Sequence, residues 1–389
     1  MNARAVFGAM QAATLAARVV ARTRSEIGST HPPPPAEGPC RVLMVGMYPE
    51  RFAGTRYRLS AWARRLRRQG FEVQLALPMA EHHAVRLSHD WSPAARAEFH
   101  LRMLSARLAT IGDAGRFHVA VVHLNDLPFW DGGPPFVAAA LKRRVGRLVL
   151  DLDDLPVVGG RPELNRKARA LGRLADGLSV GNRMLPDHYQ GSPWWYVPTC
   201  VEPQEWVVPD RANRTGPPLL GWVGTPGNLR NLAVLAPILG DICRRHDTRL
   251  RIVCSQPARL PGVPEEFIQW SAEGEQADLL GIDIGLAPLL DEVKQRYTCG
   301  LKALQYMACG TPVVASAVGP LPTIVSHEQT GLLASTPDAW GHALERLMID
   351  RDLRLRLGTA GRGAVEERWS FAVHEPAFLD ALRGLRPHG

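Results

Sequence analysis

The feature of the sequence that most constrains its fold is a repeated alternation of short apolar runs with longer amphipathic stretches. Residues 41–45 are Arg-Val-Leu-Met-Val and are closed by Gly46, the pattern of a buried parallel strand. Apolar residues then recur at helical spacing over 59–66, and residues 71–77 alternate as a second strand. This strand–helix–strand unit predicts a mainly parallel sheet with helices on both faces.

The same pattern continues through the first half of the chain and starts again in the second half. Further strands are predicted at residues 119–123, 147–151, 177–180, 219–224, 250–254, 282–286 and 312–315, and helices at about 229–243 and 301–308. The 389 residues suit two domains at roughly 150 residues each. The sequence therefore predicts an α/β protein of two facing Rossmann-like, doubly wound parallel-sheet domains with a ligand cleft between them.

Composition divides the chain into four segments. Residues 198–218 contain five prolines, which indicates a linker between domains. The predicted segments are a tail over 1–39, an N-terminal domain over 40–205, a C-terminal domain over 206–368 and a final helix over 369–389, for which packing against the N-terminal domain is one option. The first 25 residues carry four arginines and no acid, so an amphipathic helix on an anionic membrane face and a loose terminus are the alternatives for the tail, which ends in a Pro-rich spacer.

Net charge limits the classes of binding partner, and cysteine content bears on the cellular compartment. A net charge of +8 favours an anionic partner, which includes nucleic acid, an anionic membrane surface and a phosphorylated small molecule. No nucleic-acid motif accompanies the basic residues 64–68, so we expect no nucleic acid. Six cysteines without zinc spacing and no apolar run of about 18 residues indicate a cytoplasmic protein, with peripheral contact at the inner face of the cell membrane as an option. No Gly-x-Gly-x-x-Gly follows a first strand, which disfavours a dinucleotide oxidoreductase.

The most informative stretch is 300–316, Gly-Leu-Lys-Ala-Leu-Gln-Tyr-Met-Ala-Cys-Gly-Thr-Pro-Val-Val-Ala-Ser. A glycine turn opens a predicted helix there, so free backbone N–H groups and the positive end of the helix dipole are available to a phosphate. Lys302 lies in the first helical turn, where the dipole disfavours a cation. Either Lys302 faces an anion, or it is a solvated side chain with a packed stem.

This stretch resembles the donor-binding motif of glycosyltransferase family 4, in which a helix ending in "MACG" precedes "PVVAS". The resemblance continues, in the expected order, at Thr55–Arg58, Asp151–Asp154, Gly221–Gly224, Gly319–Val325 and Gly331–Leu333. It spans about residue 41 to the C-terminus. It implies a GT-B fold, a nucleoside-diphosphate sugar donor, retention of anomeric configuration, and no bound metal or other cofactor.

The resemblance also implies roles for particular residues. The catalytic candidates are His123 at the donor sugar and Lys302 and Arg230 at the diphosphate, with a strand-capping role as the alternative for His123. The implied donor-binding residues are Gly54, Thr55, Arg56, Thr225, Asn228, Arg230, Trp270, Gly300, Leu301, Lys302 and Gln305. The implied acceptor-side residues are Asn125, Asp126, Asp153 and Asp154. The last two either bind acceptor hydroxyls or orient a basic neighbour such as Arg56.

Several positions depart from the family pattern, among them Thr225, Arg230, Thr323 and Asn125. Tyr297 and Gln305 stand where members carry glutamates; Gln305 retains a hydrogen bond for a ribose hydroxyl, whereas Tyr297 supplies no carboxylate. The predicted function is a glycosyltransferase with an unknown acceptor, for which a lipid-linked compound and a polysaccharide are options. The alternatives are a nucleotide-sugar-binding protein without turnover and a nucleotide-sugar epimerase.

Acidic residues at two predicted strands have further interpretations. Asp151 and Asp153 spell the Asp-x-Asp of metal-dependent transferases, whose oxygens could hold Mg²⁺ or Mn²⁺. So short a motif also occurs by chance, and we favour a site without metal. Asp283 is expected to organise the loop before Pro288.

Overall fold

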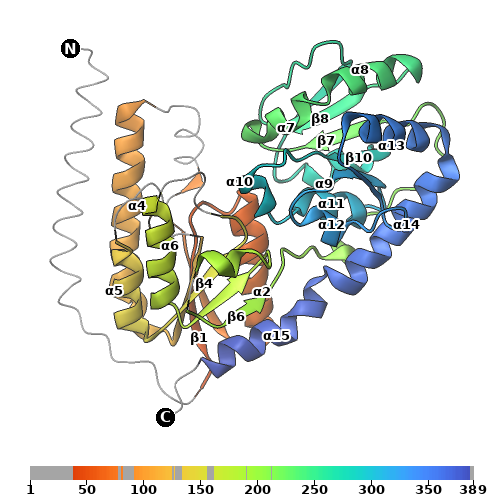
Figure 1. The fold of residues 1–389 in the computed structure, drawn as a ribbon. Helices are drawn as coiled ribbons and strands as arrows, with labels where there is room; N and C mark the ends of the chain where they lie inside the picture. Colours follow the sequence, from red (N-terminus) through yellow and green to blue (C-terminus); the bar gives the residue numbers. More distant parts are fainter. Residues whose placement is uncertain are drawn as a thin grey trace. The chain divides into compact units, whose positions relative to one another are not determined.

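The structure is a computed structural model and describes residues 38–77, 80–81, 92–124, 127, 134–155, 162–189, 191–211 and 213–385. The chain divides into two compact units (Figure 1). Unit 1 comprises the chain up to residue 198 together with residues from 376 onward, and unit 2 comprises residues 199–375. The predicted tail up to residue 37, and the acceptor-side candidates Asn125 and Asp126, lie outside the described residues.

Unit 1 contains a six-stranded, all-parallel sheet with the strand order β2-β1-β3-β4-β5-β6. Its strands are β1 (Arg41–Val45), β2 (Glu72–Ala76), β3 (Val119–His123), β4 (Arg147–Leu152), β5 (Gly177–Val180) and β6 (Trp194–Tyr196). Its helices are the π-helix η1 (Gly54–Ser60), α2 (Ala61–Arg68), α4 (Pro93–Asp113), α5 (Phe136–Val145), α6 (Pro162–Leu174) and the short 3₁₀ turns η2 (Ala114–Arg116) and η3 (Leu185–His188).

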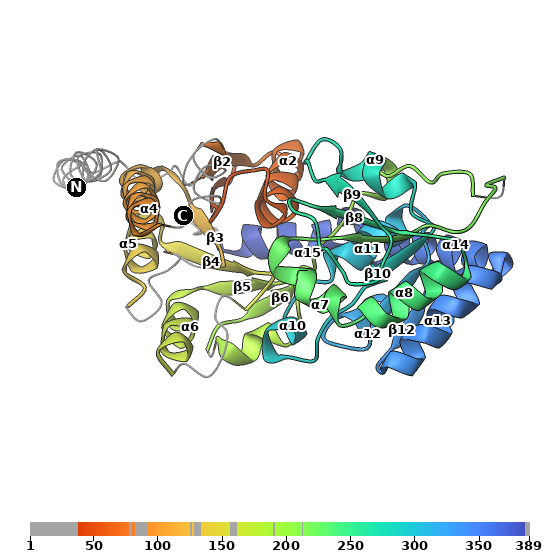
Figure 2. The ribbon, with the colours of Figure 1, turned by 90° about the horizontal axis from the view of Figure 1, so that it is seen from above.

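The helices of unit 1 cover both faces of its sheet. Helices α4, α5 and α6 lie along one face and α2 along the other (Figure 2). Right-handed crossovers produce this division, because the chain moves one way along the sheet from β1 to β2 and the other way from β2 to β6. The last helix, α15 (Phe371–Gly384), packs Phe378 edge-on against Trp62 of α2 at 4.7 Å between ring centroids. Both side chains are buried, so this contact extends the core on the α2 face.

Unit 2 contains a second six-stranded, all-parallel sheet, of order β12-β11-β10-β7-β8-β9. Its strands are β7 (Leu220–Val223), β8 (Leu250–Cys254), β9 (Glu265–Gln269), β10 (Ile284–Ala287), β11 (Val313–Ser316) and β12 (Leu332–Ala334). Its helices are α7 (Leu229–Ala233), α8 (Ala236–Arg245), α9 (Glu275–Leu280), α10 (Val293–Arg296), α11 (Leu301–Ala308), α12 (Leu321–Ile324), α13 (Pro337–Ile349), α14 (Arg351–Arg368) and the 3₁₀ turns η4 (Pro203–Glu205) and η5 (Pro226–Asn228). One core cluster joins α8 and α13 to the sheet around Trp222, and α14 packs on α11.

The predicted fold class is confirmed: two doubly wound parallel sheets are present. The strand order reverses between β1 and β3 in unit 1 and between β7 and β10 in unit 2, and such switch points are where open α/β sheets bind ligands. The three-residue strands β6 and β12 were not predicted, because three residues are too few for a periodic signal. Within the described residues, no helix is long and apolar enough to traverse a bilayer.

One predicted helix is wrong. A single helix was expected over about 229–243, and the structure has α7 and α8 with a break at Val234–Leu235. Pro237 lies in the first turn of α8. Its ring would clash with the carbonyl of Ala233 and it has no N–H to donate there, so the helix ends and restarts.

Candidate functional site

At the switch point of unit 2, strand β7 is hydrogen-bonded to a tyrosine of α11. Strands β7 and β10 pair only at their first two residues, Leu220 with Ile284 and Gly221 with Gly285. Beyond these pairs the Tyr306 hydroxyl accepts a hydrogen bond from the Val223 N–H at 2.9 Å and donates to the Gly221 carbonyl at 3.3 Å. Burial raises the pKa of Tyr306, so the phenol stays neutral and keeps its proton to donate. Helix α11 is thereby fixed to the strand ends that it flanks.

The N-terminus of α11 has the geometry of an anion site. Gly300 precedes the helix in the left-handed region, at φ 69°. A β-carbon at this position would lie 2.4 Å from Ile324 Cδ1, so both conformation and packing require glycine. Gly300, the N-cap residue, has no side chain with which to cap the helix, so the first N–H groups remain directed at the carboxyl edge of the sheet.

Lys302 is half-buried in the first turn of this helix. Burial lowers the pKa of Lys302, and the negative charge of Glu275 opposes that effect without cancelling it. Among the described residues, no hydrogen bond or ion pair to the Lys302 ammonium is found. A partly desolvated cation that the dipole disfavours and that no carboxylate neutralises is suited to an anionic ligand.

The other donor-side candidates surround the carboxyl ends of β7 and β9. The exposed Arg230 forms an ion pair with Glu292, and the Asn228 amide donates to Thr225 Oγ1 at 3.2 Å. Trp270 follows β9 directly and is half-buried, and its backbone N–H donates to the Cys254 carbonyl at 2.9 Å. Leu301 is half-buried, whereas Gln305 is only 1% exposed within α11.

Two polar side chains that the sequence did not single out hold the loop after β10. Ser316 Oγ accepts from the Leu289 N–H at 2.9 Å, and Asn231 Oδ1 accepts from the Leu290 N–H at 3.4 Å. Ser316 is the serine that closes the "PVVAS" run, which is the signal that could have identified it. Both bonds fix the loop between β10 and α10, next to the switch point.

In unit 1, His123 ends β3 at the corresponding switch point and is 1% exposed. Its Nε2 lies 3.1 Å from Asp153 Oδ1, which makes Nε2 the donor, because an ionised carboxylate only accepts. Nδ1 is buried and has no hydrogen-bond partner in the described part of the chain. A β-carbon on Gly54 would lie 2.9 Å from His123 Cε1, so Gly54 is required for the ring to fit. Leu124 follows in the left-handed region at φ 60°, a strained position of the kind that clusters at functional sites.

Asp153 is kept ionised beside this histidine. Burial raises the pKa of Asp153, but the charge and hydrogen bond of His123 and the charge of Arg58 outweigh it, so the pKa of the carboxyl is lowered. Asp153 is 8% exposed, and Asp154 Oδ1 accepts from the Leu155 N–H at 2.8 Å. Thr55, in η1, is fully buried and donates to the Tyr48 carbonyl at 2.7 Å.

Asp151, within β4, is paired with an arginine of η1. Arg58 binds Asp151 through two hydrogen bonds, Nε to Oδ2 at 3.1 Å and Nη2 to Oδ1 at 2.5 Å. Ser179 Oγ donates to the same Oδ1 at 2.7 Å, and Arg58 Nη1 donates to the Val197 carbonyl. Arg56 is half-buried with its guanidinium 5.2 Å from the centroid of the Tyr57 ring, and its orientation by Asp153 or Asp154 stays a prediction.

The first carboxylate of the Asp-x-Asp run is therefore engaged in an ion pair. Asp151 is 2% exposed and both of its oxygens accept from Arg58 or Ser179. In the ranges that the structure describes, no three His, Cys, Asp or Glu side chains gather as a potential metal site. That the site works without metal stays a prediction.

We expected Asp283 to organise the loop before Pro288, and this prediction is wrong. It precedes β10, so it lies at the amino edge of the sheet, whereas that loop lies at the carboxyl edge. Its Oδ2 accepts from the Leu219 N–H and its Oδ1 from Arg214, each at 2.7 Å. The aspartate instead ties the end of the linker to the sheet.

Comparison with known proteins gives these sites a family context. Residues 217–350 match the family model described as "Glycosyl transferases group 1". The D-inositol 3-phosphate glycosyltransferase of Corynebacterium aurimucosum is 29% identical over 301 residues, which are 62% of this chain and 70% of that protein. The matches to other curated relatives of the same name are shorter and span 37%, 28% and 20% of those proteins.

Solved structures match nearly the whole chain. The sucrose-phosphate synthase of Thermosynechococcus elongatus superposes with a TM-score of 0.65 at 16% identity, over 89% of this chain and 99% of that one. HepE of Anabaena, in complex with UDP and glucose, superposes with a TM-score of 0.64 at 11% identity, over 89% of this chain and 100% of that one. Residues 217–350 are therefore a domain of the group 1 glycosyltransferases, and the chain that carries them has the GT-B fold.

Proposed function

We propose that this protein is a glycosyltransferase that moves a sugar from a nucleoside-diphosphate sugar to an acceptor. The observation that carries the proposal is the N-terminus of α11, where backbone N–H groups and Lys302, which has no ion-pair partner among the described residues, adjoin the switch point of a group 1 glycosyltransferase domain. Stabilising the departing diphosphate is the principal demand of such a transfer, because negative charge grows on that group as the glycosidic bond breaks.

Each candidate residue has a role in this proposal. Lys302 and the α11 N–H groups bind the diphosphate, and Arg230 joins them by exchanging its exposed partner Glu292 for phosphate. Trp270 flanks the base. His123, oriented by Asp153, directs its free Nδ1 at the transferred sugar, and retention of configuration is part of the proposal.

Names of the relatives suggest the first compounds to try. HepE was solved with UDP and glucose and with UDP-glucose, which makes UDP-glucose the first donor. Several curated relatives are named for D-inositol 3-phosphate, and a mannosyltransferase of Mycobacterium tuberculosis is named for GDP-mannose and a phosphatidylinositol monomannoside. An inositol-containing or lipid-linked acceptor is thus our first choice, with a polysaccharide as the second. The lipid-linked acceptor would bring the protein to the inner membrane face.

The test is release of free nucleoside diphosphate from UDP-glucose and GDP-mannose, with and without inositol phosphate and a membrane-lipid extract. We expect release that depends on the acceptor. Binding of a nucleotide sugar by calorimetry without release in any combination would instead favour a binding protein. Conversion of the donor sugar into an epimer without an acceptor would favour an epimerase. Unchanged release after addition of EDTA is expected for a transferase without metal.

A second prediction concerns His123. Replacement by alanine removes a hydrogen bond to the sugar and should lower kcat by about tenfold while changing nucleoside-diphosphate affinity little, because the diphosphate contacts belong to unit 2. The measurement is kcat from nucleotide release beside calorimetric affinity for the nucleotide. His123→Gln, which keeps a nitrogen donor and an oxygen acceptor, should recover part of the rate. Wild-type kcat in the alanine variant would assign His123 to structure alone.

A further inference from the structure

Unit 2 has a charged pocket at the opposite edge of its sheet from the α11 N-terminus. Its volume is about 140 Å³, and it is lined by the linker, by the segments before β7 and β10, and by the first turn of α14. The lining includes four arginines, Arg211, Arg214, Arg351 and Arg354, and one acid, Asp283. β7 and β10 begin at this edge, whereas Gly300 and Lys302 adjoin the ends of the strands. The pocket is therefore separate from the proposed donor site.

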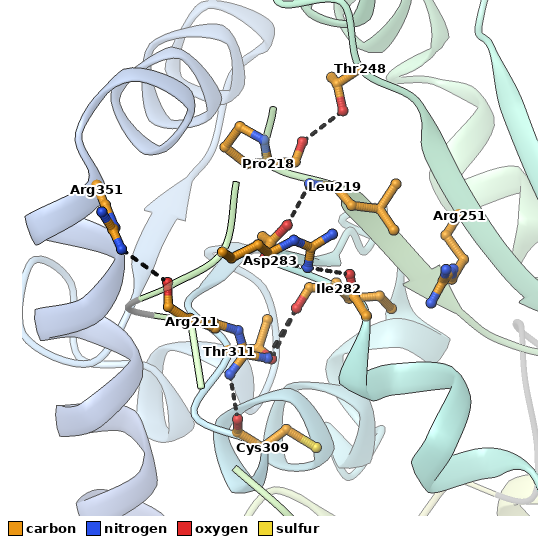
Figure 3. Close-up of polar contacts among 12 residues, drawn as sticks. Arg211, Pro218, Leu219, Thr248, Arg251, Ile282, Asp283, Cys309, Thr311 and Arg351 are labelled. Atoms are coloured by element: carbon orange, nitrogen blue, oxygen red, sulfur yellow. Dashed lines mark hydrogen bonds and ion pairs between the residues drawn. The ribbon is translucent and has the colours of Figure 1, made fainter. Parts of the chain in front are cut away.

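Arg211, in the linker, lines the pocket and contacts the C-terminal end of α11. Its Nη1 donates to the Cys309 carbonyl at 2.8 Å, and its Nη2 donates to Thr311 Oγ1 at 2.5 Å and to the Ile282 carbonyl at 3.0 Å (Figure 3). Its Nε is buried and has no hydrogen-bond partner among the described residues. Burial lowers the pKa of Arg211, against the attraction of the Asp283 charge. The guanidinium thus adds a positive charge that neutral carbonyls, not carboxylates, surround.

The other arginines retain unused donors. Within the described residues, Arg351 makes one weak hydrogen bond, from Nη2 to the Arg211 carbonyl at 3.5 Å (Figure 3), and Arg354 donates only through Nη1, to the carbonyls of Leu347 and Met348. A guanidinium has five N–H donors, so both can donate to a further group. Both lie in the first turn of α14, where the helix dipole disfavours cations.

The acidic side chains near the pocket do not balance the positive charge of its arginines. Asp283 is 4% exposed and already accepts from Arg214 and from the Leu219 N–H. In the part of the chain that the structure describes, no carboxylate lies within ion-pair distance of Arg211, Arg351 or Arg354. Asp350, the N-cap of α14, accepts from the Leu353 N–H. The charges of Asp283 and, more weakly, Asp350 attract Arg354 at longer range. Four cations and one occupied carboxylate therefore share the pocket.

We propose that this pocket binds a phosphate group of a ligand other than the sugar donor. A tetrahedral dianion offers several acceptor oxygens to the unused donors of Arg351 and Arg354, and the charge of Arg211 adds to its attraction, which suits this cluster better than a planar carboxylate does. The volume holds on the order of five water molecules, at about 30 Å³ each, so a phosphate group fits and a whole nucleoside diphosphate does not. The shared chemistry is a phosphate, free or as a monoester.

The experiment separates this pocket from the donor site by using full-length protein that carries Lys302→Ala. Inorganic phosphate is titrated calorimetrically at constant ionic strength into this protein, and into the same protein with Arg351→Gln or Arg356→Gln added. Arg351 is chosen because its hydrogen bond to the Arg211 carbonyl is weak, so we expect its loss to leave the fold intact. Arg356 is the matched control, since it is exposed on the same helix and donates to the Glu328 carbonyl at 3.2 Å.

We expect saturable binding of phosphate to Lys302→Ala, weakening by about tenfold or more with Arg351→Gln and little change with Arg356→Gln. Glycerol phosphate, titrated in parallel, distinguishes the sources: tighter binding than phosphate supports an esterified ligand, and weaker binding supports the free ion. Absence of saturable binding for both probes, or equal weakening by the two arginine variants, would overturn the proposal. None of these readouts depends on glycosyl transfer.

Discussion

Lys302→Ala is expected to weaken binding of a nucleoside diphosphate by about 10- to 150-fold, the worth of a charge-assisted contact of roughly 1.5 to 3 kcal/mol. The physical reason is that the ammonium is partly desolvated and, among the described residues, has no ion-pair partner, so an incoming phosphate meets a charge that needs neutralising. Calorimetric titration with UDP and GDP measures the effect.

Thermal stability should barely change in the same variant. Because burial lowers the pKa of Lys302, the charged form costs free energy in the folded state at neutral pH, and the dipole adds to that cost. Alanine removes both costs, although it also removes the attraction to Glu275. The matched control is Lys294→Ala, an exposed lysine of α10, for which we expect affinity close to that of the wild type. Equal affinities in the wild type and Lys302→Ala would refute the phosphate role, and a large fall in melting temperature would make Lys302 structural.

The pH dependence of nucleotide binding follows from the same pKa. The ammonium binds phosphate only while protonated, so affinity should be full well below the lowered pKa and fall as pH rises through it. The fall should begin at a lower pH than an ordinary lysine would give. Lys302→Ala should abolish this limb of the profile, which calorimetry at several pH values would show.

The largest effect on stability is expected for Arg58→Met. The substitution leaves the Asp151 carboxylate buried at 2% exposure with Ser179 as its remaining side-chain donor, and it frees the Val197 carbonyl. Breaking a buried pair in this way costs about 3 to 5 kcal/mol, because the surviving charge has lost its partner and water cannot replace it. Urea unfolding, followed by circular dichroism, should show the transition of the variant displaced to lower denaturant.

Two variants distinguish the ion pair from a general effect of losing an arginine. Arg64 lies on the adjoining helix α2, where its side chain is 52% exposed and its Nη1 is 3.9 Å from Glu50 Oε1. The substitution Arg64→Met should lower the free energy of unfolding by about 1 kcal/mol at most. Replacing both partners, as Arg58→Met with Asp151→Leu, should recover much of the loss, since no buried charge then remains. A double variant as unstable as Arg58→Met alone would show that the ion pair is not the cause.

The local pattern of the sequence determined the elements of the fold and the position of one site. Buried parallel strands are continuous apolar runs, so residues 41–45 and 250–254 were predicted with the bounds that the structure shows. The turn at Gly300 and the start of α11 followed from the local chemistry of glycine and of helix ends. Both kinds of signal arise among residues a few positions apart, which a sequence displays directly.

Tertiary structure alone decided which charged groups are paired and which are free. Asp151 and Arg58 are 93 residues apart in the chain, and Asp283 meets the Leu219 N–H across 64 residues. These partners are chosen by strand order, since residues meet only where crossovers place their strand ends together, and no local pattern encodes that distance. The sequence singled out Lys302 but presented Arg351 and Arg354 as cations among many; packing determined that Arg58 is neutralised inside unit 1, whereas these three have no ion-pair partner among the described residues.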